Sequence, residues 1–144
     1  MKKRVSLVVL MVLFVTILQG CSFGSISKDK VRDLEYTIVP DEDVPEELKT
    51  IIEEKKSQAF QLSYAAGNDL YIAIGYGEQK TGGYSIVLEE LYATDDAVIV
   101  STNLLGPGKE EKVESALTYP YIVIKTEYLD LPVKYSGVKN SFTE

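Results

Sequence analysis

The sequence predicts a mainly β domain, an antiparallel β-sandwich or open barrel, with one amphipathic helix near its start. Beyond Phe60, apolar residues recur at every second position in several short stretches. Turns rich in Gly, Pro and Asp separate these stretches, as in sandwiches of the immunoglobulin-like type. Ten tyrosines without a tryptophan also favour strands.

The first two elements are a strand and the helix. Apolar and polar residues alternate over 34–39, which predicts a strand that ends at Pro40. The acidic segment 41–47 predicts a helix start, with Asp43 as the cap and Glu46 three residues later. One apolar helix face is then expected from Leu48, Ile51, Ile52 and Ala59, opposite a run of Glu and Lys.

The remaining elements are strands. They are expected at 60–64, 70–74, 84–89, 97–100, 121–124 and 131–135. The 70–74 segment is apolar nearly throughout, which is typical of a central strand covered on both faces. Turns are expected at Gly67–Asp69 and Thr94–Asp96, because Gly and Asp favour turn conformations.

The N-terminus has the anatomy of an export signal. Three cations precede the apolar run 5–17, whose helical length of roughly 20 Å is short of the ~30 Å hydrocarbon core of a bilayer. The sequence Leu18-Gln19-Gly20-Cys21 that ends this run resembles the bacterial lipobox. That resemblance implies a signal peptide over residues 1–20, lipidation of Cys21, and a location on the extracytoplasmic side of the cell membrane.

Cys21 is the only cysteine of the chain, so an intramolecular disulfide is excluded. Acylation accounts for a lone exported thiol, and the two chains of a diacylated cysteine suffice for stable anchoring in a lipid bilayer. We therefore expect a lipidated tether over 21–33, a β domain over 34–139 and a frayed tail over 140–144.

The charge of the chain excludes nucleic acid as a partner. Removal of residues 1–20 takes away three of 15 cations and none of 22 carboxylates, which leaves a net charge near −10. Such a surface repels phosphate groups, and it also repels anionic lipid headgroups. The lipid, rather than the protein surface, would therefore hold the membrane.

The composition also argues against an enzyme. The chain has no histidine, which removes histidine-activated nucleophiles and histidine-ligated metals. Its acidic pairs, such as Glu89-Glu90 and Asp95-Asp96, lack the spacing of a catalytic pair or a Ca²⁺ loop. No catalytic residue, metal or cofactor is therefore expected.

One loop, Tyr76–Tyr84, stands out between two expected strands. It contains three glycines and is longer than a tight hairpin requires. Two interpretations remain open for it. It is either a hairpin end with a β-bulge at Gly82-Gly83, or a loop that contacts a partner.

The loop carries a resemblance to a known family. Tyr71-Ile72-Ala73-Ile74, then Gly77-Glu78-x-x-Thr81-Gly82-Gly83-Tyr84, then Thr118-Tyr119-Pro120-Tyr121 are similar in order and separation to the C-terminal domain of the protease-complex subunit PrcB. The resemblance extends over roughly residues 58–125. It implies an exported, non-catalytic lipoprotein that associates with an extracytoplasmic, subtilisin-like serine protease.

Three functions follow as hypotheses. The first is an adaptor that binds an extracytoplasmic partner, such as a protease, and stabilises it at the membrane. The second is a protease inhibitor that uses the Gly77–Tyr84 loop, because this loop is also similar to chagasin-type and BsuPI-type inhibitors. The third is a structural or carrier lipoprotein without a protease. The contact residues expected for the first two are Glu78, Lys80, Thr81, Gly82, Gly83, Tyr84, Tyr119 and Pro120.

Overall fold

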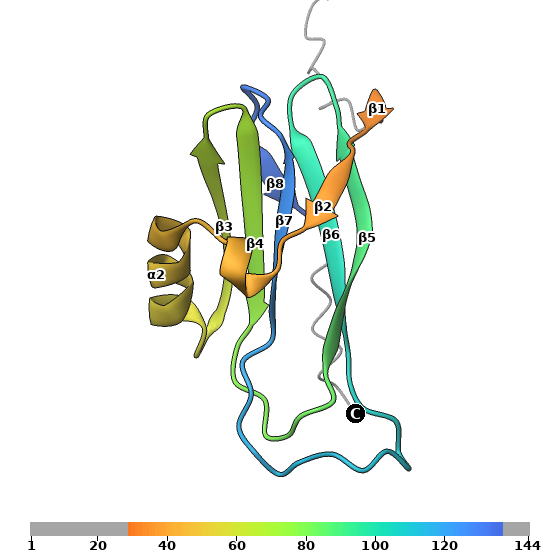
Figure 1. The fold of residues 1–144 in the computed structure, drawn as a ribbon. Helices are drawn as coiled ribbons and strands as arrows, with labels where there is room; N and C mark the ends of the chain where they lie inside the picture. Colours follow the sequence, from red (N-terminus) through yellow and green to blue (C-terminus); the bar gives the residue numbers. More distant parts are fainter. Residues whose placement is uncertain (1–28, 137–144) are drawn as a thin grey trace, which may run out of the picture.

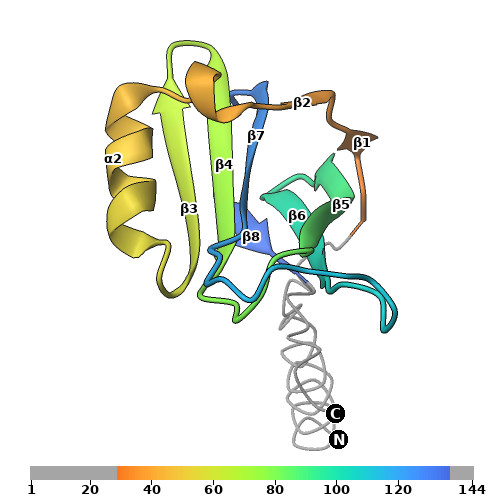
Figure 2. The ribbon, with the colours of Figure 1, turned by 60° about the horizontal axis from the view of Figure 1, so that its bottom comes forward.

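The computed structural model describes residues 29–136, which form two open four-stranded sheets and one α-helix (Figures 1 and 2). In chain order the elements are β1 (Arg32–Asp33), β2 (Tyr36–Ile38), the 3₁₀ turn η2 (Asp41–Asp43), α2 (Glu46–Lys55), β3 (Ala59–Ala66), β4 (Asp69–Tyr76), β5 (Ser85–Ala93), β6 (Val98–Leu105), β7 (Tyr121–Glu127) and β8 (Val133–Tyr135).

The two sheets have different neighbours. The helix-bearing sheet has the strand order β2-β7-β4-β3, and α2 packs on its outer face. The opposite sheet has the order β1-β5-β6-β8. All strand pairs are antiparallel except β6 with β8, which is parallel. The prediction of a mainly β, two-sheet domain is confirmed, and the sheets are open rather than closed into a barrel.

The main core lies between the two sheets. β4 contributes Leu70, Ile72, Ile74 and Tyr76, all of them buried, and β6 and β7 add Val98, Val100, Ile122 and Ile124. The expected central strand is therefore confirmed, because β4 pairs with β3 on one side and β7 on the other. Its alternate residues face two separate cores, which explains its nearly continuous apolar sequence.

A second core lies between α2 and the helix-bearing sheet. Leu48 and Ile52 of the helix are almost completely buried against Ala73 of β4 and Val123 of β7. The expected apolar helix face is thus present, but Ala59 lies in β3 because α2 ends at Lys55.

The expected helix cap is wrong. Asp43 belongs to the separate 3₁₀ turn η2, and α2 begins after Pro45 without a side-chain cap hydrogen bond. Pro45 fits this place because the first turn of a helix requires no hydrogen bond from its N–H groups. The acidic residues Glu46 and Glu47 still lie in the first turn, where the helix dipole favours negative charge.

The expected first strand is divided between the two sheets. β1 pairs with β5, and β2 pairs with β7, so the chain crosses from one sheet to the other between Asp33 and Tyr36. Leu34 is buried in the main core at this crossing. The first strand therefore begins at Arg32, slightly before the expected domain start.

The hairpin interpretation of the Tyr76–Tyr84 loop is also wrong. β4 and β5 lie in different sheets, so the loop is a crossover between them. The register irregularity that the sequence placed at Gly82-Gly83 lies instead within β5, between Leu88 and Glu90. Within residues 29–136, no helix is long and apolar enough to cross a membrane.

Candidate partner-contact site

The two ends of the sandwich differ in their connections (Figure 1). At one end the chain turns at 67–68, 94–97 and 128–132; we call this the turn end. At the other end lie the crossover 77–84 and the connection 106–120; we call this the loop end. The expected contact residues all belong to the loop end.

The crossover and the segment before β7 lie side by side. Gln79 and Thr118 form an isolated antiparallel bridge, in which each backbone N–H donates to the other residue's carbonyl at 2.8 and 2.9 Å. Gln79 is only 6% exposed, and its side-chain amide donates to the carbonyl of Tyr76 at 3.3 Å. The two segments that the sequence singled out, more than 30 residues apart in the chain, are therefore joined in space.

Further hydrogen bonds connect the same segments. The hydroxyl of Thr118 donates to the carbonyl of Thr81 at 2.7 Å. The N–H of Gly82 donates to the carbonyl of Glu114 at 3.0 Å, and the N–H of Tyr76 donates to the carbonyl of Pro120 at 3.1 Å. The crossover is thus fixed along its length by the 106–120 connection.

Two glycines of the crossover are required by its shape. Gly77 and Gly83 have φ angles of +77° and +83°, which residues other than glycine adopt only with strain. A Cβ atom at Gly83 would lie 2.6 Å from Val113 and 2.9 Å from Pro107. At Gly82, by contrast, a Cβ atom would meet nothing within 4 Å. Gly83 therefore permits the close approach of the crossover and the 106–120 connection.

The aromatic residues of the site also take part in intramolecular contacts. The hydroxyl of Tyr119 donates to the Glu78 carboxylate at 3.2 Å, and the Lys56 ammonium lies 5.7 Å from the centre of the Tyr119 ring. Tyr84 packs half-buried against the main core. Burial raises the pKa of Tyr76, whose hydroxyl shares a hydrogen bond of 2.8 Å with Thr102.

The eight expected contact residues are unequally accessible. Glu78, Lys80 and Gly83 are exposed. The half-buried residues are Thr81, Gly82, Tyr84, Tyr119 and Pro120. Gly83 faces the neighbouring 106–120 connection, so the loop is held against that connection and does not project as a free hairpin.

The sequence interpretation did not select the 106–117 stretch as a contact region. Its outermost turn is held by two bonds: the N–H of Glu111 donates to the carbonyl of Gly108 at 3.0 Å, and the N–H of Gly108 donates to the Glu111 carboxylate at 3.1 Å. Leu117 is 57% exposed, the second largest exposure among the large apolar side chains described. The signal for this region was the Gly106-Pro107-Gly108 sequence followed by charged residues.

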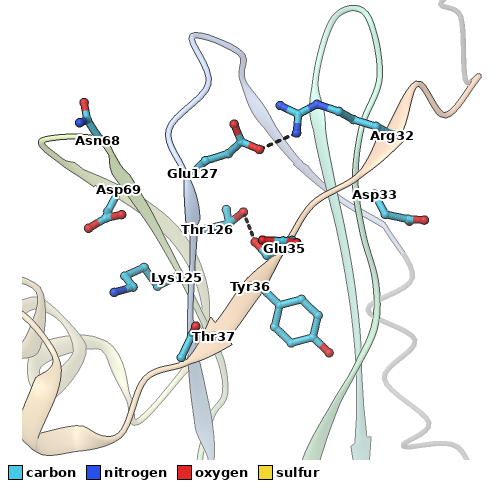
Figure 3. Close-up of a pocket in the computed structure, with 10 residues that line it drawn as sticks. All are labelled: Arg32, Asp33, Glu35, Tyr36, Thr37, Asn68, Asp69, Lys125, Thr126 and Glu127. Atoms are coloured by element: carbon cyan, nitrogen blue, oxygen red, sulfur yellow. Dashed lines mark hydrogen bonds and ion pairs between the residues drawn. The ribbon is translucent and has the colours of Figure 1, made fainter.

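A shallow depression of about 600 Å³ lies toward the turn end (Figure 3). It is lined by polar and charged side chains, with few apolar ones, so it differs from the cavity expected of a carrier for apolar ligands. Across it the Arg32 guanidinium donates to Glu127, and this hydrogen bond lowers the pKa of the Glu127 carboxyl. Among residues 29–136, no group of three or more acidic side chains is arranged to hold a metal.

The fold and the loop end together define a class: a two-sheet β domain whose crossover carries a Thr-Gly-Gly-Tyr sequence fixed against a long connection. Within that class, residues 70–127 match the family model described as PrcB C-terminal, which supports the resemblance to that family. The match extends from β4 to β7 and includes the whole loop end. No curated protein and no solved structure gives a significant match.

Proposed function

We propose that the chain is a membrane-anchored, non-enzymatic subunit whose loop end binds an extracytoplasmic serine protease and stabilises it at the membrane. The observation that carries this proposal is the loop end itself, inside the PrcB C-terminal match. There two segments distant in sequence are joined by the Gln79–Thr118 bridge into one surface. The family supports the class of partner, because PrcB is an accessory rather than a catalytic subunit of a protease complex.

The anchor is part of the proposal and rests on the sequence alone. Cys21 and the signal peptide lie outside the described residues. Their pattern is that of an exported lipoprotein, and a diacylated cysteine anchors a domain whose net acidic surface would not bind anionic lipid.

The physical argument for the loop end is preorganisation. A partner that binds a loop already fixed by hydrogen bonds avoids the entropy cost of ordering that loop on association. The exposed groups on this surface are of mixed chemistry: the Lys80 ammonium, the Glu78 carboxylate and the apolar Leu117 side chain. Such a surface suits a non-obligate interface, which combines a small apolar centre with a polar rim.

The test is affinity purification from detergent-solubilised membranes of the native cell, with the full lipoprotein as bait. Three baits are compared: the wild type, a loop-end variant with Lys80→Glu and Leu117→Ser, and a turn-end control with Asp95→Lys. The changed residues are all exposed, so each bait should fold, which circular dichroism verifies.

We expect the wild-type and control baits to recover one protease in a stoichiometric amount. The loop-end variant should recover none of it. Activity of that protease, measured with and without the protein, then distinguishes a stabilising subunit from an inhibitor. If the loop-end variant recovers the protease as well as the wild type does, the loop end is excluded as the contact surface. A Cys21→Ser variant should leave the membrane fraction, and its retention there would exclude the lipid anchor.

A further inference from the structure

One edge of the helix-bearing sheet is unlike the other three sheet edges. The edge strands β1, β2 and β8 contain two or three residues, whereas β3 at the remaining edge contains eight. Proteins protect exposed edges with short strands, charges, prolines or bulges. β3 has none of these, and the whole stretch 57–68 carries no charged residue in a strongly acidic chain.

The hydrogen-bond pattern shows which backbone groups of β3 are unpaired. The N–H of Tyr76 donates to Pro120, so the backbone groups of Tyr76 face β7. Those of Gly75 therefore face β3, where Gly75 is opposite Phe60, because pairing alternates along an antiparallel strand. The same alternation leaves the N–H and C=O groups of four residues directed away from β4: Ala59, Gln61, Ser63 and Ala65.

The side chains of β3 divide between two different environments. Phe60, Leu62 and Tyr64 pack against the core beneath α2. Gln61 and Ser63 share a face with the buried Ile74 and Ile72 of β4, yet they are exposed. β3 thus extends beyond the region that the opposite sheet covers, and its free edge is accessible from that face.

We propose that an extended, uncharged segment of a partner protein pairs with the free edge of β3 and adds a fifth strand to the helix-bearing sheet. In such β-augmentation the main-chain hydrogen bonds provide affinity, and the alternate side chains provide specificity. Here one set of the segment's side chains would lie beside Phe60, Leu62 and Tyr64, and the other beside Gln61 and Ser63.

The charge of this edge determines the chemistry of the segment. Residues 57–68 carry no charge, so a charged side chain placed beside Leu62 or Ser63 would gain no ion pair from β3. Small, aliphatic or hydroxylated side chains need no such partner, and β-branched ones also favour the extended conformation.

The position of α2 argues against a second copy of this chain as the occupant. In Figures 1 and 2 the helix runs along the outer side of β3, at the margin of the molecule. Residues directly opposite each other in a sheet share a face, so twofold pairing of two β3 edges would bring both α2 helices onto the same face at the joint. A single extended segment brings no helix.

The inference goes beyond the proposed function, because β3 lies outside the loop end. Its test is photocross-linking in native membranes, with the photoreactive residue p-benzoylphenylalanine introduced at Gln61, at Lys80 or at the exposed helix residue Thr50. Cross-linked peptides are sequenced by mass spectrometry. We expect Gln61 to yield one continuous, uncharged segment of a single protein, and Thr50 to yield none of it.

A proline variant provides the matched control. The N–H of Ser63 faces outward, so Ser63→Pro keeps the β3–β4 hydrogen bonds and the fold while removing a donor from the free edge. Leu62→Pro removes a bond to β4 and should lower the unfolding midpoint strongly. We expect Ser63→Pro to reduce the Gln61 cross-link at least tenfold with an unfolding midpoint close to that of the wild type.

Three results would overturn the inference: no cross-link from Gln61 above that from Thr50, a cross-link that Ser63→Pro leaves unchanged, or a cross-link to a second copy of this chain. The Lys80 position separates this result from the proposed function. If Lys80 gives cross-links and Gln61 gives none, the loop-end proposal stands and the β3 inference fails. If Gln61 gives cross-links and Lys80 gives none, only β3 remains as a docking site.

Discussion

Both ends of the sandwich join strands, but the hydrogen bonds that hold their connections differ. At the turn end the connections are short, and the Thr94 turn bonds to itself: the hydroxyl of Thr94 accepts from the N–H of Asp96 and Ala97 within one turn. At the loop end the connections are long and bond to each other, as Thr118 does to Thr81 across 37 residues. A turn of the first kind depends only on its own residues, whereas the loop end depends on the whole domain.

This difference explains the Thr-Gly-Gly-Tyr sequence. Its threonine carbonyl accepts from Thr118, its second glycine approaches Val113, and its tyrosine packs on the main core. The sequence therefore first serves to hold two loops together, and a contact surface follows from that assembly.

The largest effect is expected from the two neighbouring glycines. Gly83→Ala places a Cβ at positive φ and 2.6 Å from Val113, which should lower the free energy of unfolding by about 2–4 kcal/mol. Gly82→Ala meets nothing within 4 Å and should change it by less than about 0.5 kcal/mol. Urea unfolding measures both. Equal losses would mean that the close approach at Gly83 is not a structural requirement.

The two threonines should separate local from long-range effects. Thr94→Ala leaves two backbone N–H groups of one turn without their partner, that of Ala97 being buried, and should cost about 1–2 kcal/mol. Thr118→Ala removes a half-buried bond and should cost about 1 kcal/mol. In hydrogen exchange monitored by NMR, Thr94→Ala should affect its own turn alone, whereas Thr118→Ala should accelerate exchange at Gly82 in the other segment. Acceleration confined to the mutated segment in both variants would remove the distinction.

Two tyrosines with buried hydroxyl groups offer a smaller contrast. Tyr76→Phe removes the hydroxyl that bonds Thr102 and should cost about 1 kcal/mol. Among the described residues the buried hydroxyl of Tyr135 finds no partner, so Tyr135→Phe should be neutral or slightly stabilising. A loss of more than about 1 kcal/mol for Tyr135→Phe, by the same urea measurement, would contradict the unpaired hydroxyl.

The same Tyr135 predicts a dependence on alkaline pH. Burial raises its pKa to about 12, so its contribution to stability is complete below the unfolded-state value of about 10 and is lost as pH rises toward 12. Burial also raises the pKa of Tyr121 to about 12, in the same direction. Tyr135→Phe should therefore flatten the fall in stability between pH 10 and 12. An unchanged slope would show that Tyr135 does not carry this shift.

The smallest effect belongs to the turn end. The hydrogen bond from Thr94 lowers the pKa of Asp96, with Lys134 adding to the same direction. The stabilisation is therefore present above the ordinary pKa of an aspartate and is lost as pH falls through the lowered value. Thr94→Ala should return the Asp96 pKa toward its usual range in an NMR titration, and Lys134→Ala should shift it less. If Lys134→Ala shifts the pKa of Asp96 more than Thr94→Ala does, Lys134 and not Thr94 is the main cause of the lowered pKa.

The strands could be predicted from the sequence because their pattern is local. The alternation in β3, the apolar run in β4 and the turn at Thr94 depend on neighbouring residues only. The sheet assignment could not be predicted, since nothing within residues 76–84 shows whether β5 pairs with β4 or joins the other sheet. The split of the first strand at Leu34 has the same cause.

The candidate site shows the same limit. The Thr-Gly-Gly-Tyr and Thr-Tyr-Pro sequences could be identified from the resemblance, but their hydrogen bonds join residues that only the fold brings together. The role of Gly83 depends on Val113, which lies in a charged segment with no strong pattern of its own. The free edge of β3 could not be anticipated either, because an edge strand and an inner strand can share one alternating sequence.

The central claim, that the loop end is one preassembled surface, is tested most directly by amide hydrogen exchange of the free protein. The N–H groups of Gln79, Gly82 and Thr118 donate to carbonyls of the neighbouring segment. We expect them to exchange together, nearly as slowly as the amides of β7. If instead they exchange at the rate of the exposed turn at 109–110, the two segments are not held together before a partner binds, and the loop end is not a preassembled surface.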